Sequence, residues 1–474
     1  MYLQGRSLRL RKAGRRSNPR RVFFLVVLIA SGLFLLSLER RDVIQPIGQP
    51  TAAPTRVAST YAEEAEAQFA AGNLKAAIAA YQQARVADPK NLEYTVAQAR
   101  IQVYAEDYAG ALKTAEVALV ISPNNAKSRA IYAWTLDWNV SVGCACKTLA
   151  EAEAAAVTAI ALDSNYAPAH AYYSEILNDS GKWSQGFQEA ETALALDPNL
   201  LESHRALGYA YESIGQYGDA INSYLNALKI NPNLISLYIQ LGLNYRNGLQ
   251  DYEQAIFYFG KASAIDPENV APYLYLSRTH YQNDELGTAI QYLEQALVRE
   301  PDNPDIHGRL GLIFFRRRNY EGAEPELALA VEGGTVDGAG NPLTYANGLP
   351  VVDINGEPME SSDGVVLQVQ GLLPNTATTL EYYYTYGNLL AYLDRCRPNE
   401  APKWLQIALN QAPDDPTVQG SFEESMAICS GELTVDEAVD GTATPESAST
   451  AAAPAATQPP PAATEAPPPA TAAP

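Results

Sequence analysis

Apolar, small and polar positions repeat along most of the chain with a period near 34 residues. Prolines mark the period, and Ala220 and Ala227 stand twelve and five residues before Pro232, as alanines do in most other units. Small residues let two antiparallel helices approach closely, and a proline ends the second helix because it lacks an N–H group. The pattern therefore predicts stacked helical hairpins. The marking prolines are Pro89, Pro123, Pro198, Pro232, Pro267 and Pro301.

The fullest unit runs from Leu201 to Pro232 and carries a fixed order of large, small and aromatic residues. Its marker residues are His204, Leu207, Gly208, Tyr211, Gly215, Tyr217, Ala220, Tyr224, Ala227 and Pro232. The unit resembles the tetratricopeptide repeat (TPR) family, and the resemblance covers about residues 58–334 and again 381–430. It implies an all-α, right-handed solenoid of about nine helix-turn-helix repeats. We expect the first eight repeats at 58–334 and the final repeat, with a capping helix, at 379–430.

The third unit is longer than the others. It runs from Pro123 to Ser164, which is 41 residues against a period of 34, so seven residues are inserted. We expect the inserted residues in the turn between the two helices of this unit, around residues 137–144. The eighth unit ends at Gly333 and Gly334, where the helical pattern stops.

Residues 335–378 show no helical period. Asp-Gly and Asn-Gly dipeptides recur there between short runs of β-prone residues, which is a signal for hairpins. We therefore expect a small β-rich insertion, and whether it binds a partner stays open. The β-prone runs are Leu343–Tyr345, Leu349–Val352 and Val365–Val369.

Residues 22–38 are 17 uncharged, mostly apolar residues, at the short end of the range of about 17–25 for a membrane-spanning helix. Leu-Glu-Arg-Arg follows in place of a small-residue cleavage site, which favours an uncleaved transmembrane anchor over a cleaved signal peptide. Residues 1–21 hold eight Arg or Lys and predict a basic cytoplasmic arm. We expect a single-pass protein of the cytoplasmic membrane with its N-terminus inside, residues 39–57 as a linker, and the repeats extracytoplasmic.

Charge is divided unevenly along the chain. The net charge is −21, but residues 1–41 hold ten basic residues and one acidic residue, which leaves 23 basic and 53 acidic residues in the remainder. A body with a net charge of 23 − 53 = −30 argues against nucleic acid as the main partner, because phosphate contacts need basic surface. Residues 431–474 are rich in Ala, Thr and Pro and are expected to be disordered.

The sequence offers no catalytic residues, no metal site and no cofactor site. The four histidines, His170, His204, His280 and His307, fall at packing positions of the repeat, and no nucleophile–base pair or phosphate loop stands out. Cys396 and Cys429 lie 33 residues apart, nearly one period, so a disulfide between them is plausible in an oxidising compartment. For Cys144 and Cys146, a local disulfide and two exposed thiols both remain open.

The family resemblance also implies a concave face lined by the first helix of each repeat. Four arginines on this face of an acidic protein suggest a groove for a peptide, because arginine binds carboxylates through two hydrogen bonds and tyrosine adds rigid contact area. Pairing of these arginines with Glu202, Glu212 and Asp305 in the same groove is an equally open interpretation. The candidate peptide-binding residues are Arg205, Tyr209, Leu243, Arg246, Asn247, Arg278, Tyr281, Gln282, Phe315 and Arg316.

These features together predict a non-catalytic, membrane-tethered scaffold that binds a protein or peptide through its concave face. Two alternatives stay open. One is an accessory subunit of an envelope enzyme or of a secretion or assembly complex, and the other is a solenoid that assembles with itself. The sequence does not decide the partner or the oligomeric state.

Overall fold

The computed structural model describes residues 18–39, 56–143, 148–353, 355–396, 400–436 and 438. The chain divides into two units, Met1–Val57 and Ala58–Pro474. Cys144 and Cys146, most of the basic arm and nearly all of the C-terminal tail lie outside the described residues. The predictions made for these segments therefore stay predictions.

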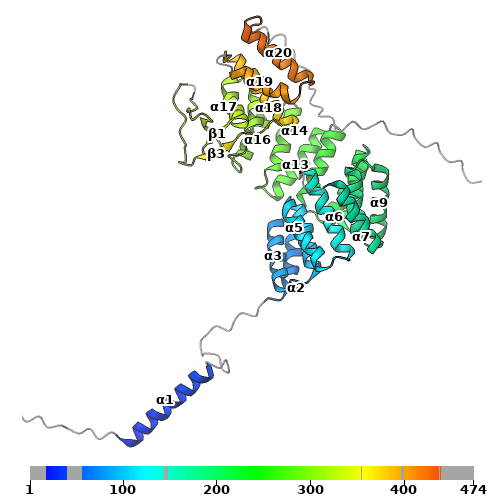
Figure 1. The fold of residues 1–474 in the computed structure, drawn as a ribbon, viewed down its shortest axis with the longest axis vertical. Helices are drawn as coiled ribbons and strands as arrows, with labels where there is room; N and C mark the ends of the chain where they lie inside the picture. Colours follow the sequence, from blue (N-terminus) through cyan, green and yellow to red (C-terminus); the bar gives the residue numbers. More distant parts are fainter. Residues whose placement is uncertain are drawn as a thin grey trace, which may run out of the picture. The chain divides into compact units, whose positions relative to one another are not determined.

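The first unit contains α1 (Pro19–Glu39), drawn in blue in Figure 1. Its described side chains, which reach Ser31 and Leu33, are exposed. Among the residues that the structure describes, no helix is long and apolar enough to cross a membrane. The span expected at residues 22–38 stays a prediction.

The second unit is a stack of helical hairpins (Figure 1). The first four are α2 (Ala58–Ala70) with α3 (Leu74–Ala87), α4 (Leu92–Tyr104) with α5 (Tyr108–Ile121), α6 (Ala126–Ser141) with α7 (Leu149–Leu162), and α8 (Ala167–Asp179) with α9 (Trp183–Leu196). The next four are α10 (Leu201–Ser213) with α11 (Tyr217–Ile230), α12 (Ile235–Leu243) with α13 (Tyr252–Ile265), α14 (Ala271–Gln282) with α15 (Leu286–Leu297), and α16 (Pro304–Arg316) with α17 (Tyr320–Val331). The last is α18 (Ala377–Tyr392) with α19 (Glu400–Gln411), followed by α20 (Pro416–Ser430). The predicted all-α solenoid is confirmed, and its right-handed twist stays a prediction.

Each hairpin closes over small residues, as the alanine pattern predicts. Ala220 and Ala227 are fully buried, and so are their equivalents in the other repeats. A glycine near the middle of the first helix faces a large side chain of the second, and a Cβ atom on Gly242 would lie 2.4 Å from the Phe259 ring. Only a residue without a side chain fits at this distance. The glycine contacts of this kind are Gly208–Tyr224, Gly242–Phe259, Gly311–Leu327 and Gly387–Leu405.

One recurring hydrogen bond holds the turns between successive hairpins. The side chain six residues after the end of a hairpin meets the carbonyl oxygen there: Tyr238 Oη donates to Pro232 O at 2.8 Å, and His204 Nε2 lies 2.9 Å from Pro198 O. This bond satisfies a carbonyl oxygen of the turn, which lies beyond the end of the helix. A histidine at this position therefore packs in the repeat and forms a hydrogen bond with the carbonyl oxygen of the turn. The other residues that make it are Arg129, His170, Tyr273, His307 and Gln419.

The third repeat corrects the prediction for the inserted residues. Residues 137–141 do not lie in the turn, because α6 continues to Ser141 and the turn begins at Val142. The buried Asn139 donates through Nδ2 to Tyr108 O at 2.8 Å, and Trp138 stacks on the Tyr108 ring with centroids 5.1 Å apart. Packing against α5 thus accompanies a helix of 16 residues, against 13 in α4 and α8, which is nearly one turn longer.

The insertion contains a three-stranded antiparallel sheet in the order β2-β1-β3, with β1 at Gly333–Val336, β2 at Pro342–Tyr345 and β3 at Leu367–Gln370. The sequence indicated β2 and β3 but missed β1, whose two glycines read as the end of a repeat. The run Leu349–Val352 forms isolated bridges and no strand. The sheet lies beside α17 (Figure 1). Val336 and Val369 of the sheet pack on Leu329 of α17.

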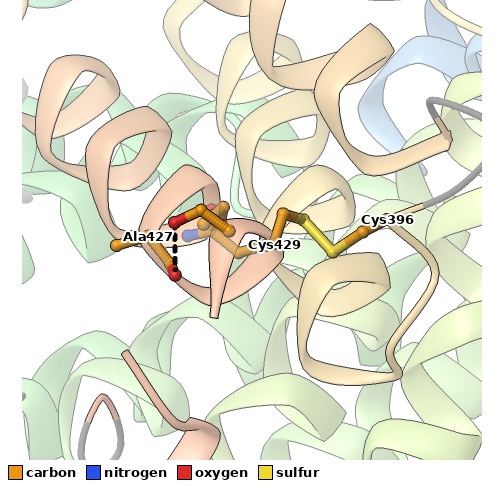
Figure 2. Close-up of a disulfide and its surroundings, with 6 residues drawn as sticks. Cys396, Ala427 and Cys429 are labelled. Atoms are coloured by element: carbon orange, nitrogen blue, oxygen red, sulfur yellow. Dashed lines mark hydrogen bonds between the residues drawn. A yellow bond between two sulfur atoms is a disulfide. The ribbon is translucent and has the colours of Figure 1, made fainter. Parts of the chain in front are cut away.

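The C-terminal helix α20 is joined to the preceding hairpin by a disulfide. Cys429 at the end of α20 bonds to Cys396, with Cα atoms 5.4 Å apart (Figure 2). This is the pair that the sequence suggested. Only Val418 and Ser425 of α20 are buried, so the covalent bond supplements a small packing interface.

We predict that Gly242→Ala lowers the free energy of unfolding by about 1–3 kcal/mol, because the new methyl group meets the fully buried Phe259 ring. Gly260→Ala is the matched control. Gly260 also lies within a helix, α13, but a Cβ atom there would meet no other atom within 4 Å, so this variant should gain up to about 1 kcal/mol from helix propensity. Denaturation of both full-length variants measures the difference. Equal stability of the two would contradict the packing account.

Candidate functional site

The first repeats close on the sixth. Asn231 Nδ2, at the turn between α11 and α12, donates to Phe69 O at 3.2 Å. Asn233 Nδ2 donates to Ala70 O at 2.8 Å in the same contact. These bonds join residues more than 160 positions apart, and one hydrophobic core contains residues from α2 to α12. The inner face of α4, α6, α8 and α10 is consequently enclosed.

Charged and aromatic side chains of the chain itself fill this enclosed face. Glu202 of α10 is 1% exposed, accepts a hydrogen bond from Tyr104 Oη at 3.0 Å and pairs with Arg100 at 3.4 Å. Arg100 in turn lies over the Phe69 ring, 4.9 Å from its centroid. A buried carboxylate needs partners of this kind, because its transfer out of water is costly.

A second buried carboxylate holds Arg205, one of the predicted groove residues. Glu175 accepts a hydrogen bond from Trp134 Nε1 at 2.7 Å and forms an ion pair with Arg205. The Arg205 guanidinium lies 4.9 Å from the centroid of the Trp134 ring, which stacks on Tyr172 with centroids 4.4 Å apart. Tyr209, the next predicted residue, donates its hydroxyl to Asp179. Both predicted residues thus have partners inside the chain.

Acidic groups outnumber their partners around Arg205. Burial raises the pKa of Asp137, and the charges of Asp179 and Glu175 raise it further. Burial also raises the pKa of Asp179 and Glu175, although Arg205 acts in the opposite direction on both. Asp137 is 2% exposed, and its Oδ1 has no hydrogen-bond partner among the described residues. This carboxylate therefore opposes folding when it is charged.

Beyond the closed part, the inner face of α12, α14, α16 and α18 gathers arginines. Arg246 lies in a π-helical turn, η1 (Asn244–Gly248), which directly follows α12. Its guanidinium carbon is 5.6 Å from the centroid of Phe259 and 5.7 Å from that of Tyr275. Arg246 is 4% exposed, its Nε donates to Asn247 Oδ1 at 3.0 Å, and its Nη1 has no partner in the described part of the chain.

Arg246 also has cationic neighbours. Burial lowers the pKa of Arg246 to about 10, and the charges of Arg278 and Arg309 add to this effect. Arg278 is exposed, and within the described residues neither it nor Arg246 forms an ion pair. Arg309 pairs with Asp305 at 2.7 Å. Burial raises the pKa of Glu381 on α18, while Arg278 and Arg309 act to lower it. Cationic charge is therefore only partly neutralised on this face.

The remaining predicted residues lie on the same face or near it. Arg316 pairs with Asp284 at 3.0 Å and lies 4.8 Å from the Tyr281 ring centroid. Phe315 packs with Tyr320 and Tyr392. Gln282 has a buried Oε1 without a partner among the residues described. The structure thus divides the predicted groove: it encloses Arg205 and Tyr209 and leaves the positions from α12 onward on an arginine-rich face, Arg246, Asn247, Arg278, Tyr281, Gln282, Phe315 and Arg316.

A cavity of about 210 Å³ lies where the closed part meets the arginine-rich face. Leu243, a predicted residue, lines it together with Arg205 and Tyr275. A larger depression is lined by α11 alone and is an open surface. In the described part of the chain, no group of three or more histidine, cysteine or carboxylate side chains is placed to hold a metal ion.

Sequence reasoning missed the residues that matter most for this division. Trp134 and Glu175 occupy inward positions of the third and fourth repeats. Together with Glu202, which the sequence already suggested as a partner of the arginines, they were a usable signal of a filled interior. Arg309 and Glu381 had no such signal, because they join the face only through the packing of α16 and α18.

Asp137→Asn should stabilise the protein at pH 7–8 by about 1–2 kcal/mol. The folded-state pKa of Asp137 is raised, so the folded protein binds this proton more tightly and wild-type stability falls as pH rises from about 4 through the raised pKa. The advantage of the variant should therefore shrink toward pH 4. Thermal unfolding from pH 4 to 8 measures it, with the exposed Asp414→Asn as control. A variant less stable than wild type at pH 8 would contradict the assignment.

Comparison with known proteins agrees with the repeat pattern. A tetratricopeptide repeat model matches residues 63–126, 234–304 and 274–339, and a TPR repeat model matches residues 213–248. Among solved structures, a thermophilic TPR protein of Thermus thermophilus is 19% identical, with 40% of this chain and 98% of that chain covered and a TM-score of 0.34. The pilF protein of Pseudomonas aeruginosa is 18% identical, with 43% and 90% covered and a TM-score of 0.35. No curated protein sequence matches the chain. The helical hairpins within residues 63–126 and 213–339 are accordingly tetratricopeptide repeats.

Proposed function

We propose that the chain is a non-catalytic scaffold that binds an extended, acidic segment of another protein. The binding surface is the arginine-rich face on α12, α14, α16 and α18. Tetratricopeptide repeats generally bind protein partners, and a stack of hairpins offers a continuous surface to an extended segment.

The observation that carries the proposal is the buried guanidinium of Arg246, which forms no ion pair among the described residues and has an Nη1 without a partner there. A buried charge is normally paired, because its loss of hydration is otherwise uncompensated. Arg278 and Arg309 nearby make the local excess positive. A carboxylate from a partner would supply the missing counter-charge, and arginine binds carboxylates through two parallel hydrogen bonds.

Rigid aromatic side chains on the same face support binding of a peptide. Tyr275 and Tyr281 lie beside Arg246 and Arg316, so a bound segment would meet cations and apolar rings together. Tyrosine contributes contact area at a low cost in side-chain entropy and is enriched at interfaces. The acidic remainder of the body would repel an acidic partner elsewhere, which would direct it to this face.

We further propose that the apolar run at residues 22–38 tethers the chain to the cytoplasmic membrane, with the repeats on the outer side. Support comes from the basic arm before the run and the absence of charge within it. The Cys396–Cys429 disulfide agrees with an oxidising compartment. The scaffold function does not depend on this tether.

Reversal of two arginine charges should abolish recognition of acidic peptides. A displayed peptide library selected on the full chain in detergent should enrich Asp and Glu, and Arg278→Glu with Arg316→Glu should weaken the selected peptides at least about tenfold. Binding should also weaken as salt rises. The control is Arg317→Glu with Lys113→Glu, an equal charge change at two exposed positions. Peptides without acidic bias, or an equal loss in the control, would refute the proposal.

Alkaline extraction of membranes from bacteria that express the full chain tests the tether. The chain should stay in the membrane fraction, and Leu28→Arg with Leu33→Arg should release it, because each arginine costs about 2.5–3.5 kcal/mol at the centre of a span. Gln45→Arg with Gln49→Arg, in the predicted linker, is the matched control and should stay bound. Recovery of the unaltered chain in the soluble fraction would rule out the tether.

A further inference from the structure

The cavity between the closed repeats and the arginine-rich face is built mainly from aromatic and aliphatic side chains. Its walls come from α4, α5, α6, α10, α12 and α14 and from the turn after α4. Four aromatic rings line it, together with aliphatic residues such as Leu243. The rings are Tyr104, Tyr108, Trp138 and Tyr275. A volume of about 210 Å³ is below the range of about 300–1,000 Å³ of pockets for drug-sized molecules, and it suits a single ring.

Three residues of the cavity wall carry buried hydrogen-bonding atoms without a partner among the described residues. They are Nε of Arg205, Nε1 of Trp138 and Oγ of Ser236. Buried donors are almost always satisfied in folded proteins, because an unmade hydrogen bond costs free energy. Three such side chains around one small cavity favour an oxygen-bearing ligand, or water, over a purely apolar one.

Charge in the cavity disfavours an anionic ligand. The guanidinium of Arg205 is already paired with Glu175. A second carboxylate, that of Glu106, belongs to the wall, and burial raises its pKa. A further carboxylate would meet like charges here, whereas a neutral hydroxyl group can accept from the unpaired donors and donate to Glu106.

We propose that this cavity binds a phenol group, the side chain of a tyrosine. The assignment of this tyrosine to the partner protein rests on the proposed function. The specificity of the cavity for a phenol does not depend on that function. Tyr275 joins the two sites, because it lines the cavity and lies 5.7 Å from the Arg246 guanidinium. The partner segment therefore carries a tyrosine close to an acidic residue. The tyrosine side chain binds in the cavity, and the acidic side chain binds to the arginines.

Binding of small aromatic probes to the full chain tests the proposal without a partner. Saturation-transfer NMR and calorimetry would compare p-cresol, toluene and benzoate. We expect p-cresol to bind with a Kd on the order of 1 mM, toluene to bind several-fold more weakly because it leaves the donors unpaired, and benzoate to bind at least about tenfold more weakly. Absence of saturable p-cresol binding, which would mean a cavity filled by water only, overturns the proposal.

Two substitutions locate the probe. Leu243→Trp should fill the cavity and abolish p-cresol binding, whereas Leu249→Trp, the same change at an exposed position just after η1, should leave it intact. Ser236→Ala offers a milder check and should remove most of the preference for p-cresol over toluene. Unchanged p-cresol binding in Leu243→Trp would place the probe elsewhere and refute the site.

The same probe separates this proposal from the scaffold function. Arg278→Glu with Arg316→Glu should keep p-cresol binding, because neither arginine lines the cavity. Loss of acidic-peptide binding together with retained p-cresol binding supports both proposals. If the unaltered chain binds p-cresol but no acidic peptide, the proposal for the cavity is supported and the proposed scaffold function is refuted.

Discussion

Arg205 lies between the carboxylate of Glu175 and the rings of Trp134 and Tyr104, inside the closed repeats. A buried ion pair such as that of Arg205 and Glu175 needs further hydrogen bonds to compensate for its lost hydration. The indole N–H of Trp134 supplies one of these hydrogen bonds, to Glu175. Because these side chains fill the interior, repeats one to six pack into a closed unit, with Phe69 of the first repeat bonded to Asn231. This enclosure removes the inner face of the first repeats from contact with a partner and leaves the inner face from α12 onward available.

Two chemical environments meet at the edge of the closed part. On one side Arg246, Arg278 and Arg309 present cationic charge that the chain neutralises only in part. On the other side lies a small cavity with aromatic walls and unpaired donors, and Tyr275 borders both. A ligand that offers an acidic group and a neutral hydroxyl-bearing ring satisfies both environments, which links the two proposals to one type of partner sequence.

The repeat could be predicted from the sequence because every unit obeys the same local constraint. Ala227 and Gly208 must be small for the two helices to touch, and Pro232 must end the second helix, so a period appears in the residues themselves. Closure of the first repeats depends on small angles accumulated between hairpins, which no single residue encodes. The length of α6 likewise depends on a tertiary hydrogen bond from Asn139. The sequence did not indicate strand β1, because the strand begins with two glycines and shows no alternation of apolar and polar residues.

Enclosure of the inner face of the first repeats can be tested by hydroxyl-radical footprinting of the full chain with mass spectrometry. Trp134 is 0% exposed in the closed arrangement, and Phe257 is 52% exposed on the surface of α13. We expect Trp134 to be oxidised far more slowly than Phe257, although tryptophan is at least as reactive towards the radical. Oxidation of Trp134 at a rate equal to or above that of Phe257 would mean that the inner face is an open groove and not enclosed.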